Sequence, residues 1–206
     1  MTERTNSDWA NDADITASRA PGNYNDTCVT ATVRLLTDNK TNLKSTINGM
    51  DANGGTAGHI GIQWGIQMLA PGSGLSAAAG DPKAKPGSYT DERVKKIMIV
   101  MTDGEFNRWH CNSLIDRALN NSRLNCFNPN GNSFTQAKAS CNFAKTRNIE
   151  IYFVGVGLDG SDIDIQQLTA ACSTTASHII MATDGAALKA AFEAIAANIK
   201  ALRLSM

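Results

Sequence analysis

The sequence of residues 95–105 is Lys95-Lys96-Ile97-Met98-Ile99-Val100-Met101-Thr102-Asp103-Gly104-Glu105. The run from Ile97 to Met101 contains no polar side chain, and a carboxylate and a glycine follow shortly after it. Five apolar residues are too few to cross a membrane, and their β-branched content predicts a strand that is covered on both faces. Because ligands of open α/β sheets bind where such strands end, we expect this strand to deliver Asp103 to a site.

Apolar patterns on both sides of this strand predict further strands that alternate with helices. The expected helices are 39–50, 134–147, 161–172 and 186–204, and the expected strands are 33–36, 97–101, 149–156 and 178–181. Residues 60–69 fit either structure, because their apolar side chains alternate while Ile60, Trp64 and Met68 also form a helical stripe. This order predicts an α/β fold in three layers, a mostly parallel sheet with helices on both faces.

The last predicted helix shows the clearest pattern in the chain. Asp184 is available as its cap. The apolar residues that share one face are Leu188, Phe192, Ile195, Ile199 and Leu202.

The 206 residues fit one domain of ordinary size. Residues 1–32 are polar and lack apolar periodicity, which predicts an extended peripheral segment ahead of a domain over 33–206. Two long polar segments, 71–92 and 106–133, are expected to be loops. Loops of this length in compact domains are usually functional or mobile.

The charge pattern favours neither nucleic acid nor an anionic membrane as a partner. The chain has 19 basic and 19 acidic residues and no cluster of lysine and arginine. It therefore lacks the electrostatic footprint of a protein that binds nucleic acid or an anionic membrane. No apolar run is long enough for a transmembrane helix, and residues 1–7 are too polar for a signal peptide.

Five cysteines are present, and none belongs to a Cys-x-x-Cys pair. Cys111 and Cys126 bracket a polar segment, which suits a disulfide in an oxidising compartment. Cys141 and Cys172 lie on two predicted helices that flank one strand, which would allow a second bridge, and Cys28 would then be left over. The alternative is that all five are buried free cysteines of a cytosolic protein.

The segment Gly155–Gly160 matches the pattern Gly-x-Gly-x-x-Gly directly after a predicted strand. Taken literally, it predicts a nucleotide site of the NAD type and hence a nucleotide-dependent enzyme. However, it lies late in the chain and no acidic residue stands about 20 residues further on at the end of a strand. The alternative is a tight turn between strand and helix. The histidines His59, His110 and His178 are scattered, and no Gly-x-Ser-x-Gly motif indicates a hydrolase.

Thr56, in the glycine-rich stretch 54–58, and Asp103 form a candidate metal site. A hydroxyl and a carboxylate suit Mg²⁺, which prefers octahedral oxygen ligands and keeps some of its waters. Two ligands alone would hold the ion poorly. The structural alternative is that Thr56 caps a helix and Asp103 forms a turn.

Several stretches together resemble the later half of a von Willebrand factor type A domain. They are Gly54-Gly55-Thr56-Ala57-Gly58-His59-Ile60-Gly61, Met101-Thr102-Asp103-Gly104-Glu105 and Ile151-Tyr152-Phe153-Val154-Gly155-Val156-Gly157. The closer likeness is to the C-terminal region of TadG-like proteins of tight-adherence (Flp) pili, through Thr2-Glu3-Arg4-Thr5, Asn39-Lys40-Thr41-Asn42-Leu43-Lys44 and Ile199-Lys200-Ala201-Leu202-Arg203-Leu204. The resemblance implies that residues 60–69 are a helix and that Gly155–Gly160 is a turn.

The resemblance also implies a metal ion-dependent adhesion site (MIDAS), built in the family from a DxSxS loop, a threonine and an aspartate. Thr56 and Asp103 match the last two, but no DxSxS motif stands upstream of Thr56. The site is therefore expected to be incomplete, with weak or no binding of Mg²⁺ at millimolar concentration. The first strand and helix are expected to be missing as well, as if the chain began inside a longer protein.

The function that the resemblance implies is a non-enzymatic module for pilus assembly or adhesion that binds a protein partner. Its expected location is the periplasm or the cell surface of a bacterium, with the full-length protein anchored in the inner membrane.

Overall fold

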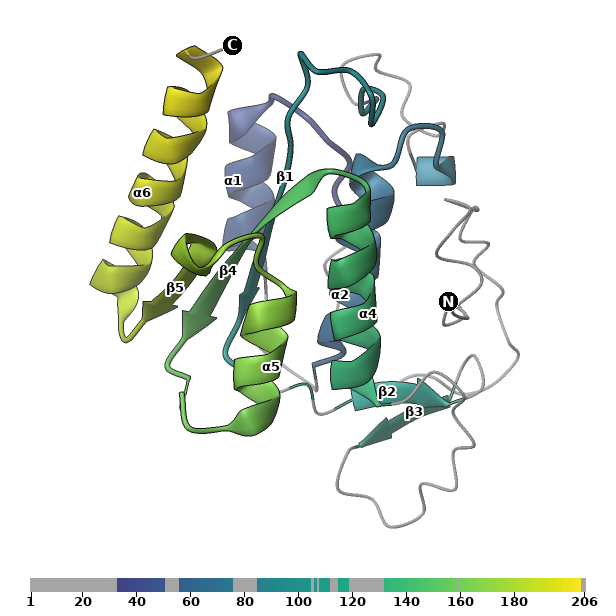
Figure 1. Cartoon of the computed structure of the whole chain (residues 1–206), viewed down its shortest axis with the longest axis vertical. Helices are drawn as coiled ribbons and strands as arrows, with labels where there is room; N and C mark the ends of the chain where they lie inside the picture. The colour runs from purple at the N-terminus through teal and green to yellow at the C-terminus, as the bar shows by residue number, and fades with distance from the viewer. Residues whose placement is uncertain are drawn as a thin grey trace. The chain divides into compact units, whose positions relative to one another are not determined.

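The computed structural model describes residues 33–50, 56–75, 85–104, 106, 108–111, 115–118, 132–158 and 160–204 (Figure 1). The chain forms two compact units, one from residues 1–88 and 106–133 and the other from 89–105 and 134–206. The predicted peripheral segment 1–32, with Cys28, lies outside the described residues.

The second unit contains a parallel sheet in the order β1-β4-β5. Its strands are β1 (Lys96–Thr102), β4 (Ile149–Val156) and β5 (Ile179–Ala182). Its helices are α4 (Ser133–Thr146), α5 (Ile163–Ala171) and α6 (Gly185–Leu204), with a short 3₁₀ helix at Ala176–His178. Strands that alternate with helices and pair in parallel confirm the predicted α/β class.

The core of this unit is built around β4. Tyr152 and Val154 pack against Ala191 and Ile195 of α6 in one apolar cluster. The alternate positions of β4, Ile151 and Phe153, point to the other face and are fully buried too. In Figure 1 the strands lie between α6 and the pair α4 and α5. Each large apolar side chain buried in this way contributes about 1.5–3 kcal/mol to stability.

The prediction that the strand at 97–101 is covered on both faces is wrong. One face of β1 is buried, but Ile99 and Met101 on the other face are 37% and 54% exposed. The exposure of Ile99 and Met101 follows from the place of β1 in the sheet. Among the described strands β1 pairs only with β4, and β4 is the central strand. A local run of apolar residues does not distinguish a central strand from an edge strand.

Helix α6 largely follows its sequence pattern. The Asp184 carboxylate accepts a hydrogen bond from the Ala187 amide at 2.8 Å, which confirms the expected cap. Ile195 is buried, whereas Phe192, expected on the same face, is 39% exposed. Ala191 takes the buried place instead, while Leu188, Ile195 and Ile199 pack on the expected face.

The first unit contains α1 (Lys40–Asn48) and α2 (Gly58–Leu69). Asn39 caps α1 by accepting a hydrogen bond from the Asn42 amide at 3.0 Å. The ambiguous residues 60–69 are helical, and Ile62 and Ile66 are buried while Ile60, Trp64 and Met68 are only half-buried.

Two predictions for the first unit differ from the structure. Residues 33–36 were predicted as a strand but form no regular element. The predicted loop 106–133 contains an antiparallel pair of strands, β2 (Arg108–Cys111) and β3 (Ile115–Ala118). In the other predicted loop, 71–92, residues 74–75 are helical and the described residues 85–92 form no helix or strand.

Candidate functional site

Asp103 follows the carboxyl end of β1. Thr102, the last residue of the strand, is buried, and its Oγ1 accepts a hydrogen bond from the Gly104 amide at 3.0 Å. Gly104 has a φ of 95°, and a Cβ there would lie 2.3 Å from Leu158 Cδ2. The turn thus depends on Thr102 and Gly104, and Asp103 remains exposed.

Thr56 precedes α2 and is half-buried. The N-cap of α2 is Ala57, and no side chain caps the helix, so the alternative role of Thr56 as N-cap is not observed. Thr56 belongs to the first unit and Asp103 to the second, so their use as a pair of ligands stays a prediction.

The start of α2 is covered by an aromatic ring. A Cβ at Gly58 would lie 2.1 Å from Phe106 Cε1, so only glycine allows the ring to approach the helix so closely. Phe106 is buried, and its carbonyl accepts a hydrogen bond from Ser133 Oγ at 2.9 Å. Sequence reasoning missed this contact, because nothing in the local pattern pairs a glycine with a phenylalanine 48 positions later.

The three histidines belong to three different elements. His59 lies in α2 and His110 in β2, while His178 ends the 3₁₀ helix. Among the described residues there is also no cluster of three or more His, Cys, Asp or Glu side chains that could hold a metal ion.

His178 belongs to a polar network on β4 that sequence reasoning missed. Its ring stacks on Tyr152 with 4.1 Å between centroids, and its Nε2 lies 3.5 Å from Glu150 Oε1. The Tyr152 hydroxyl donates to the same Glu150 oxygen at 3.1 Å. Burial, and after it the charge of Glu150, raises the pKa of Tyr152 above its usual value.

The glycine pattern after β4 forms a turn. Gly157 has a φ of 63°, and its amide donates to the Ala182 carbonyl at 2.9 Å. The Asp162 carboxylate caps α5 by accepting from the amides of Asp164 and Ile165 at 2.8 and 3.2 Å. A dinucleotide phosphate would need those amides and would meet a negative charge there, so the geometry favours the turn over a nucleotide site.

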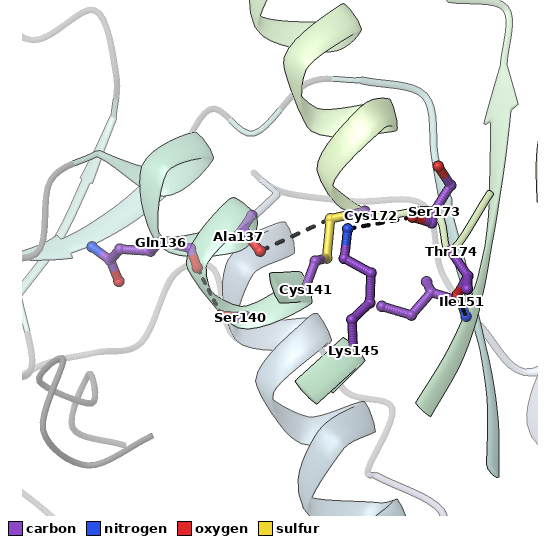
Figure 2. The surroundings of a disulfide bond; sticks show 9 residues. All are labelled: Gln136, Ala137, Ser140, Cys141, Lys145, Ile151, Cys172, Ser173 and Thr174. Carbon is purple, nitrogen blue, oxygen red and sulfur yellow. Dashed lines mark hydrogen bonds between the residues drawn. A yellow bond between two sulfur atoms is a disulfide. The ribbon is translucent and has the colours of Figure 1, made fainter. Parts of the chain in front are cut away.

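The disulfide that the sequence allows between Cys141 and Cys172 is present, with an S–S distance of 2.00 Å. It joins α4 to the end of α5 (Figure 2). Both cysteines are fully buried. Next to it, Thr174 Oγ1 accepts a hydrogen bond from the Ile151 amide at 2.7 Å, which ties the end of α5 to β4. The other expected bridge involves Cys126, which lies outside the described residues.

Comparison with models of known protein families identifies the family of this chain. A family model of the von Willebrand factor type A domain matches residues 22–194. The chain belongs to the von Willebrand factor type A family. No curated protein and no solved structure gives a significant match.

Type A domains are in general modules for protein interaction and adhesion, and they often bind a divalent metal through a MIDAS. The match covers both Thr56 and Asp103. In the part of the chain that the structure describes, no helix is both long and apolar enough to cross a bilayer.

Proposed function

We propose that this type A domain is a non-enzymatic binding module that captures an acidic group of a protein partner with the help of a divalent cation. Asp103 and Thr56 would be the metal ligands that the chain supplies. The observation that carries the proposal is the state of Asp103: it is exposed at the carboxyl end of a parallel strand, and its carboxylate makes no hydrogen bond or ion pair with the described residues.

The pairing of Asp103 with Thr56 is supported by the family match, which covers both residues.

The proposed site is incomplete. A bound Mg²⁺ or Mn²⁺ would accept a partner's carboxylate at an open position, but only two protein ligands are proposed and the DxSxS motif does not occur in the 206 residues. We therefore propose weak binding at millimolar concentration or no detectable binding without the partner.

For the biological role we propose assembly or adhesion of a tight-adherence pilus, at the periplasmic side or surface of a bacterial envelope. Its support is the TadG-like sequence pattern together with the Cys141–Cys172 disulfide, since disulfides persist mainly in oxidising compartments. A nucleotide-dependent enzyme is less well supported, because Asp162 occupies the helix end that a phosphate would need.

Paramagnetic broadening by Mn²⁺ tests the metal ligands. We expect the amide signals of residues 102–104 and 56–58 to broaden first at millimolar Mn²⁺ if the two ligands suffice, and Asp103→Asn to abolish this localised effect. Asp164→Asn, which removes an exposed carboxylate from α5, is the matched control and should leave it unchanged. Broadening that centres elsewhere, or that survives in Asp103→Asn, would overturn the assignment.

A further inference from the structure

A cavity of about 820 Å³ opens at the amino-terminal end of the sheet in the second unit. It is formed by the segment that leads into β1, the turn between α4 and β4, and Thr174 after α5. In a parallel sheet the amino ends of β1 and β4 are opposite to the carboxyl end at which Asp103 lies. The cavity is therefore separate from the proposed cation site.

The cavity is lined by three lysines, Lys95, Lys96 and Lys145. Lys96 is 5% exposed, and its Nζ lies 5.0 Å from the centre of the Tyr89 ring. The Arg147 guanidinium carbon lies 5.6 Å from the centre of the same ring. The Tyr89 ring therefore contacts two cations.

Two of these lysines have no carboxylate partner in the described structure. Lys95 is exposed and makes no ion pair with a described residue. Lys145 runs beside the disulfide and donates to the Ser173 carbonyl at 3.4 Å (Figure 2). A neutral carbonyl at that distance is a weak acceptor, and a charged oxygen would be a stronger one.

Thr174 adds a neutral donor to the lining. Its Oγ1 already accepts the Ile151 amide at 2.7 Å, and the hydroxyl hydrogen is left to donate. The Asn148 side chain lines the same cavity and can donate through its amide.

The carboxylates of the lining are mostly engaged elsewhere. Asp91 accepts two side-chain hydrogen bonds from Arg93, at 2.9 and 3.0 Å, and these bonds lower the pKa of Asp91. Glu150 accepts from Tyr152 and lies beside His178. Glu92, the third carboxylate, is exposed, so the surrounding water screens its charge.

We propose that this cavity binds an oxyanion, a carboxylate or a phosphate, between the ammonium groups of Lys95, Lys96 and Lys145, with Thr174 Oγ1 as a further donor. The oxyanion replaces the long contact of Lys145 with Ser173 by a charge-assisted hydrogen bond. The Cys141–Cys172 bridge holds two walls of the cavity together, because Lys145 lies one turn after Cys141 and Thr174 lies two residues after Cys172.

The test is a titration of the full chain followed by amide NMR signals at low salt, after divalent metals have been removed with EDTA and the EDTA has been dialysed away. The two probes are inorganic phosphate and a hexaglutamate peptide, with a hexaglutamine peptide as the neutral control. We expect saturable shifts at residues 145–150 and 173–174, and the probe that binds more tightly identifies the source of the oxyanion. Because the buffer contains no divalent metal, the result does not depend on the proposed cation site.

Lys145→Gln should weaken binding of the preferred probe about two- to fivefold, the range for one partly exposed ion pair. Lys189→Gln removes an exposed charge from the first turns of α6 and should leave the affinity unchanged. Lys95→Gln, which breaks no contact of the described structure, gives a second measurement if Lys145→Gln folds poorly. Equal affinity in all variants, or no saturable shift with either probe, would overturn the proposal.

Discussion

At the scale of single residues, Gly58 determines how closely Phe106 can approach α2. Gly58→Ala would place a methyl group 2.1 Å from the ring, so Phe106 must move out of its buried position. We expect a loss of about 1–3 kcal/mol in the free energy of unfolding, measured by urea denaturation.

A second glycine of the same helix provides the control. A Cβ at Gly61 would meet no atom within 4 Å, so Gly61→Ala should stabilise the chain by up to about 1 kcal/mol through helix propensity. If the two substitutions had the same effect, the contact between Phe106 and Gly58 would be contradicted.

Tyr152 gives a pH prediction. Its pKa is raised in the folded state, first by burial, so its contribution to stability is complete below the unfolded pKa of about 10 and is lost as pH rises through the folded pKa. Tyr152→Phe should be less stable at pH 7, because it lacks the bond to Glu150, and should lose less stability above pH 10 than the wild type. Urea unfolding at pH 7 and above pH 10 checks this, with Tyr89→Phe as control. If wild type and Tyr152→Phe lost the same stability above pH 10, the prediction would be contradicted.

At the scale of elements, the disulfide between α4 and α5 should dominate the stability of the second unit. It closes a loop with a sequence separation of 31 residues, for which the chain-entropy model gives about 3–4 kcal/mol. We expect the double variant Cys141→Ala/Cys172→Ala to lose that amount in urea denaturation. Wild type unfolded in the presence of a strong reductant should behave like the variant, and equal stability of oxidised wild type and variant would show that the bridge is dispensable.

At the scale of the whole molecule, counting free thiols tests the cysteine framework. If both expected bridges form, alkylation of the denatured, unreduced chain should modify one of the five cysteines, Cys28. Mass spectrometry gives the number directly. Modification of all five cysteines would contradict the Cys141–Cys172 bridge. A disulfide that includes Cys28 would contradict the assignment of Cys28 as the unpaired cysteine.

The candidate site was only partly predictable from the sequence. A carboxylate after an apolar strand identified Asp103 as a residue at a sheet end, because both features are local. The role of Thr102 in the turn, the ring over Gly58 and the cap by Asp162 were not predicted in detail. Each of these three contacts depends on side-chain rotamers and on neighbours that are set only when the chain folds.

The sequence by itself determined the α/β class, the bounds of β4 and the order of the elements in the second unit, because strand and helix periods are local properties. It also allowed the Cys141–Cys172 bridge, which the structure contains. Only the tertiary structure decided that β4 is central while β1 exposes Ile99 and Met101. It also decided that the adjacent Lys95 and Lys96 line one cavity together with the distant Lys145. The physical reason is that strand order and cavity walls depend on contacts between residues far apart in the chain, which no local pattern encodes.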